Sequence, residues 1–75
     1  MTVREFCLRG TLALQLCAIR EDGWIVEVVW IDHEDLFRIS ENSRDRKVLN
    51  TSFGTLPIMK EPGIVIEVPC LFIDT

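Results

Sequence analysis

The chain has 75 residues, 48% of them hydrophobic, and a formal net charge of −4 at pH 7. A chain this short forms one domain, residues 1–75, and buries only about 60% of the surface that its unfolded form exposes, so its core is small. The acidic balance disfavours a general electrostatic grip on nucleic acid, which needs many Lys and Arg side chains. So much apolar material in so small a domain predicts self-association or a protein partner instead.

The cysteines and the lengths of the apolar runs indicate in which cellular compartment the protein resides. Cys7, Cys17 and Cys70 have neither a metal-binding nor a C-x-x-C spacing. We interpret them as reduced, buried thiols, which indicates a cytoplasmic protein; a disulfide between two of them is the less favoured alternative. No apolar run is long enough to span a membrane, and residues 11–18 lack the basic leader and the cleavage site of a signal peptide.

Turn-forming residues divide the chain into short β-branched or alternating runs. This rhythm predicts an all-β fold, either a small five-stranded antiparallel meander or a partly open barrel. The stretch 3–9 is expected to extend the first strand, with a bend at Gly10. That layout is similar to SH3-like and OB-like barrels.

The first predicted hairpin turns at Asp22 and Gly23. A three-residue loop with Gly23 in the left-handed region pairs Arg20 with Trp24 and gathers the apolar residues on one face, whereas a two-residue loop mixes polar with apolar. Both tryptophans then belong to the core, and a stacking platform for a ligand is the alternative. The residues expected on this face are Leu12, Leu14, Leu16, Ala18, Trp24, Val26, Val28 and Trp30.

The opposite face of the same hairpin is also apolar, and only Gln15, Cys17 and Glu27 interrupt it. An antiparallel strand with one face in water should alternate between apolar and polar residues. Another part of the chain, a second subunit or a partner should therefore cover this face. We predict a protein-interaction surface here, made by Ile19, Ile25, Glu27, Val29 and Ile31.

The middle of the chain allows two interpretations. Asp32 could cap a helix, with Asp35 completing a weak capping box. We favour a third strand over residues 36–40, because Asn42 and Ser43 end the pattern too soon for a stable helix. One short helical turn could follow around residues 44–50.

The segment Asp32-His33-Glu34-Asp35 is the only cluster of metal-ligand residue types. Adjacent residues diverge on a strand or turn, and calcium or magnesium sites need several converging oxygens. We therefore interpret the cluster as a solvated acidic turn and predict no metal and no cofactor. No motif supplies a nucleophile for His33, the only histidine, so neither catalytic residues nor enzyme activity are expected.

Half of the eight basic residues lie close together in the sequence. They are Arg38, Arg44, Arg46 and Lys47. We interpret this stretch as a solvated, mobile loop, and contact with nucleic acid or another anion is the alternative. No exposed aromatic residues are expected among these charges, although single-strand binding normally uses them.

The C-terminal third predicts a second hairpin. Residues 55–59 form a short strand in which Pro57 marks a bulge or an edge, and Pro62 with Gly63 suits a type II turn. The last strand alternates, and Pro69 places it at an edge. Its first face is expected to hold Ile64, Ile66, Val68, Cys70 and Phe72.

Together these patterns predict a non-catalytic protein-interaction domain, either a homodimer or an adaptor or inhibitor of another protein, without membrane contact. The alternative is a small β-barrel that binds nucleic acid or an anionic ligand through residues 38–47. An acidic mimic that captures a basic protein is a third hypothesis, supported only by the small size and the charge.

Overall fold

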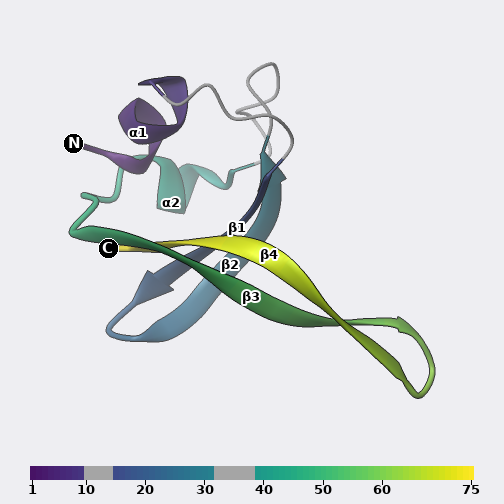
Figure 1. Ribbon diagram of the computed structural model, residues 1–75. Coiled ribbons are helices and arrows are strands. Elements are labelled where there is room, and N and C mark those ends of the chain that lie inside the picture. The colour runs from purple at the N-terminus through teal and green to yellow at the C-terminus, as the bar shows by residue number, and fades with distance from the viewer. Residues whose placement is uncertain (10–14, 32–38) are drawn as a thin grey trace.

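The computed structural model describes residues 1–9, 15–31 and 39–75 (Figure 1). Helix α1 spans Val3–Arg9 and helix α2 spans Glu41–Arg44. Strands β1 (Gln15–Glu21) and β2 (Trp24–Ile31) form one hairpin, and strands β3 (Asn50–Glu61) and β4 (Ile64–Asp74) form a second, longer one. None of the helices in these ranges is long and apolar enough to cross a membrane.

The two hairpins join into one four-stranded sheet in the order β2-β1-β4-β3. The junction is parallel, with pairs running from Leu16 opposite Cys70 to Arg20 opposite Asp74. The predicted β-rich fold is therefore confirmed, but the antiparallel meander is wrong, and the described strands form a four-stranded mixed sheet that is not closed into a barrel. A meander places each strand beside its predecessor, whereas β3 lies at the far edge here and β4 returns to pair with β1.

The first hairpin has a two-residue turn rather than the predicted three-residue loop. Asp22 and Gly23 both have positive φ, 53° and 82°, as a type I′ turn requires, and Glu21 pairs with Trp24. A bulge near the tip then shifts the register, because Ile19 pairs with Glu27 while Arg20 pairs with Ile25. Beyond this bulge Leu16 lies opposite Trp30 and Ala18 opposite Val28, so the predicted sharing of one face is confirmed for these four residues.

The second hairpin has the predicted turn, but its first strand is longer than predicted: residues 55–59 are only the middle of β3. Pro62 and Gly63 form a two-residue turn with Gly63 at φ 83°, and β3 with its Pro57 lies at the sheet edge. Pro69 marks a boundary: in the described chain β4 pairs with β1 only from Cys70 onward. Residues 64–69 of β4 therefore pair on one side only, with β3, and the distal hairpin projects from the body (Figure 1).

The N-terminus is a helix, not the predicted extension of the first strand. Thr2 and Glu5 form a reciprocal capping box: Thr2 N donates to Glu5 Oε1 at 3.1 Å, and Glu5 N donates to Thr2 Oγ1 at 3.2 Å. Val3 and Cys7 are one turn apart and both are buried. Val3 N donates to Arg46 O at 2.9 Å, which holds α1 beside the segment that follows α2.

The second helix is a single turn that shares only Arg44 with the helical turn predicted around residues 44–50, because residues 45–50 are not helical. Ile39 and Ser40 are not in a strand, which contradicts the end of the strand predicted over residues 36–40. The remainder of that strand, the Asp32 cap and the acidic cluster lie outside the described residues.

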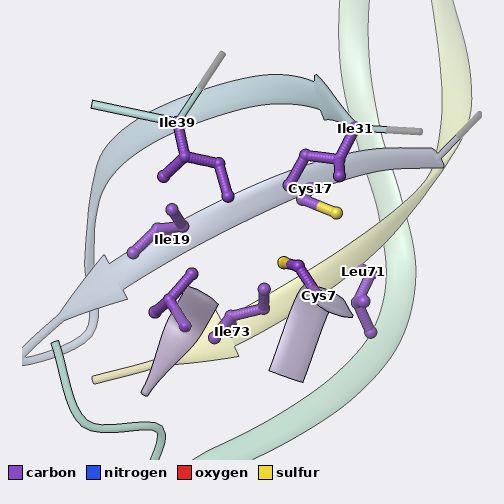
Figure 2. Packing of buried hydrophobic residues seen from close by; sticks show 8 residues of the cluster. Cys7, Cys17, Ile19, Ile31, Ile39, Leu71 and Ile73 are labelled. Atoms are coloured by element: carbon purple, nitrogen blue, oxygen red, sulfur yellow. The ribbon is translucent and has the colours of Figure 1, made fainter. Parts of the chain in front are cut away.

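The main core lies between one face of the sheet, α1 and Ile39, which precedes α2 (Figure 2). We call this face of the sheet the covered face. The buried residues of the core are Val3, Cys7, Cys17, Ile19, Ile31, Ile39, Leu71 and Ile73. The predicted tryptophan core is wrong, because Trp24 is 78% exposed and Trp30 is 40% exposed. Trp30 lies on the face opposite the helices, and Trp24 lies beside the turn of the edge strand β2.

Candidate interaction surface

The second face of the sheet has no helix of the described chain against it, and we call it the open face. The strand register assigns its members, because paired residues project to the same side. Leu16, Ala18 and Cys70 fill its centre and are buried among larger neighbours. The larger side chains around them are Val28 and Trp30 on β2, Leu56 and Ile58 on β3, and Ile64, Ile66, Val68 and Phe72 on β4.

Much of this apolar face is in contact with solvent. Val28 is 46% exposed and Trp30 40% exposed on the β2 side, and Ile64 and Ile66 are 48% and 40% exposed on the projecting hairpin. Across the sheet from Ala18 on β1 to Ile66 on β4, the described residues whose side chains lie on the open face are all uncharged. A sheet face exposed to solvent normally carries polar side chains. The open face is instead apolar, as a buried face would be, although no layer of the described chain packs against it.

Among residues 15–31 and 39–75, the charged residues of the open face lie at its two ends. At one end Arg20 holds Asp74 in a two-pronged ion pair, with Nε to Oδ1 at 2.6 Å and Nη2 to Oδ2 at 3.1 Å. The guanidinium also lies over the Phe72 ring, 4.6 Å from its centroid. At the other end Lys60 and Glu61 are the last residues of β3 before the turn of the projecting hairpin. Each end therefore combines one positive and one negative charge.

The interaction residues predicted from the sequence lie mostly on the covered face. Ile19 and Ile31 are fully buried beneath the helices, and Val29 packs against the same core. Ile19 and Ile31 have no free surface and Val29 has little, because α1 and the residues around α2 cover this face. Only Ile25 of the predicted set is largely exposed, and the bulge places it opposite Arg20 at the end of the open face.

Glu27, also in the predicted set, ties β2 to the start of α2. Its carboxylate accepts hydrogen bonds from Ser40 N at 3.0 Å, Ser40 Oγ at 2.5 Å and Ser43 Oγ at 2.9 Å. Burial by itself would raise the Glu27 pKa, but the hydrogen bonds from Ser40 and Ser43 and the Arg44 charge together lower it. The role of Glu27 here is to anchor the helix to the sheet.

The basic stretch does not form the predicted free loop. Arg44 Nε donates to Ile39 O at 2.7 Å, and Arg46 pairs with Glu21 at 2.8 Å and donates to Asn42 O at 3.3 Å. Lys47 is exposed, and its backbone forms a bridge with Thr2. Arg38 lies outside the described residues. The two described arginines of this set therefore hold the α2 region in place.

The three cysteines are free and buried, as predicted. Cys7 and Cys17 lie in the main core, and Cys70 lies at the centre of the open face. Burial raises the pKa of all three, that of Cys17 to about 12. Within the described ranges, no three His, Cys, Asp or Glu side chains group into a possible metal site; His33 is outside those ranges.

Sequence reasoning missed Val28, Trp30, Ile64 and Ile66 as surface residues because it assigned their faces to the core. A helix signal was present in the capping box Thr2-x-x-Glu5, followed by Cys7 one turn after Val3. An N-terminal helix must bury its apolar side on the sheet, which would have shown that one face is occupied from within the chain.

The sequence matches no described protein family, and no curated protein or solved structure matches it either.

Proposed function

We propose that this protein is a non-catalytic protein-interaction domain that binds through the open face of its sheet. The observation that carries the proposal is the exposed apolar band from Trp30 and Val28 on β2 to Ile64 and Ile66 on the projecting hairpin, whose described residues carry no charge. Leaving apolar surface in water costs about 25 cal/mol per Å². Binding to a protein that covers this band is therefore favourable.

The size of this band supports the proposal. From typical side-chain areas and the observed exposures, its apolar side chains present on the order of 400 Å² to solvent. The largest apolar patch on a typical monomer is about 300–600 Å² and is often a binding site. The open face lies within that range.

The alternative, binding of nucleic acid or another anion through residues 38–47, gains no support from the contacts of Arg44 and Arg46. Both guanidinium groups are engaged within the chain. A phosphate would have to compete with Glu21 for Arg46, in a chain whose net charge is already −4. The three buried thiols support the further proposal of a reducing, cytoplasmic setting.

Adjacent residues of β4 provide a matched test. Ile66 lies on the open face and is 40% exposed, whereas Val65 lies on the opposite face and is 58% exposed. A tagged protein should capture a protein, its own untagged copy included, from extract of the cells that produce it. Ile66→Glu should abolish that capture and Val65→Glu should preserve it. Equal capture by the two variants, or no captured protein at all, would contradict the proposal.

A further inference from the structure

We infer that the open face binds a second copy of this chain, and that two sheets pack with their open faces together. This inference rests on the proposed function and names its partner. The resulting assembly is a two-layer sandwich in which both copies use the same patch, as a two-fold dimer requires.

Charge complementarity favours a second copy. Each protein carries a net charge of −4, so two copies repel one another unless they meet where the surface is neutral. The part of the open face that the structure describes meets that condition, because its charges there are the neutral pair Arg20–Asp74 at one end and Lys60 and Glu61 at the other. The described residues of the apolar band offer no carboxylate to a basic partner, and they carry no charges that would repel those of a second copy across the contact.

The available area also agrees with a dimer. The exposed apolar side chains amount to on the order of 400 Å², and interfaces are about 60% apolar, so a contact of roughly 700 Å² per copy follows. A stable, specific interface needs about 800 Å² per partner. Leu16, Ala18 and Cys70 at the centre of the face are already buried, so the larger side chains around them would make the contact.

The two tryptophans provide an internal reporter. Trp30 lies within the apolar band, whereas Trp24 stands beside the Asp22-Gly23 turn and outside it. Dimer formation should therefore shield Trp30 from a soluble quencher and leave Trp24 accessible. The contrast can be read in variants that retain one tryptophan each, Trp24→Phe and Trp30→Phe.

The primary experiment is the mass of the full, reduced chain by light scattering after size exclusion, across a dilution series. We expect a dimer of the 8.7 kDa chain that dissociates on dilution. Ile66→Glu should raise the dissociation constant at least about a hundredfold, because the new carboxylate would be buried without a partner. Val65→Glu, the matched control, should leave the mass unchanged.

The possible results distinguish a failure of the dimer inference from a failure of the proposed protein-interaction function. A monomer at every concentration overturns the inference, and so does equal dissociation by both variants. If the chain is monomeric but extract capture still depends on Ile66 and not on Val65, the proposed function stands with another protein as partner. If Ile66→Glu fails to fold, acrylamide quenching of the Trp24→Phe protein decides: quenching of Trp30 that does not increase on dilution overturns the inference.

Discussion

The ring of Phe72 occupies the space above Gly54, on the paired strand. A Cβ atom built on Gly54 would lie 2.9 Å from Cε2 of Phe72, closer than side-chain atoms normally approach. Strand pairing sets this contact, since Gly54 pairs with Cys70 and Ser52 with Phe72 on the same face. The aromatic ring therefore leans across β3 at the point where that strand has no side chain.

Gly54→Ala should destabilise the protein by about 1 kcal/mol, since overpacking against the ring outweighs the strand preference of alanine. Urea denaturation would measure the change. Ser52→Ala, an exposed neighbour on the same strand, should change the stability by less than about 0.5 kcal/mol. Phe72→Leu combined with Gly54→Ala should recover most of the loss attributed to the clash, and strict additivity of the two changes would contradict the assigned contact.

The Glu27 carboxylate should make stability depend on acid. Its pKa in the folded protein is lowered from the ordinary 4.5, so the stabilisation is complete above that value and is lost as pH falls through the lowered pKa. Glu27→Gln should cost about 1–2 kcal/mol near pH 7, because the hydrogen bonds from Ser40 and Ser43 lose their charged acceptor. Urea midpoints at neutral and acidic pH should converge for the variant and the parent; a constant difference would rule out this role.

Arg20 and Asp74 should be coupled more strongly than the more exposed pair Arg4 and Asp45. The first pair is two-pronged with side chains 28% exposed, whereas the second has a separation of 3.3 Å and side chains 51% and 75% exposed. Double-mutant cycles with Arg→Met and Asp→Asn changes should give a coupling energy of about 1 kcal/mol for the first pair and less than about 0.5 kcal/mol for the second. A larger coupling energy for Arg4 and Asp45 than for Arg20 and Asp74 would show that distance and burial do not determine the strength of these ion pairs.

The thiols should be inert in the native protein. Cys7, Cys17 and Cys70 are at most 2% exposed, and burial raises the pKa of each, so the thiolate that reacts with disulfide reagents is scarce at pH 8. Labelling by a chromogenic disulfide should therefore follow the rate of unfolding, and all three thiols should react at once in denaturant. Fast labelling of any one of them in the folded protein would contradict the burial described here.

Local chemistry was readable from the residues alone. The turn at Pro62 and Gly63 and the place of Pro57 at an edge depend on fixed φ and missing backbone donors, which act within a few residues. The alternation of Ile64, Ile66, Val68, Cys70 and Phe72 on one face is likewise a property of any extended strand. The first turn was misjudged because a bulge further along β2 compensates for a shorter loop and recovers the same faces.

Which of two apolar faces would be covered could not be derived from periodicity, because both faces of β1, β2 and β4 are apolar. Tertiary structure decided it. The N-terminal residues form a helix held by backbone bonds to residues 46 and 48, and that helix packs on the Ile19 and Ile31 face. The parallel pairing of β1 with β4 joins residues more than 50 positions apart, and no local preference encodes such a contact. The sequence by itself determined that both faces of these strands would be apolar; only the packing of α1 determined that the face without a helix of the described chain is that of Trp30 and Ile66.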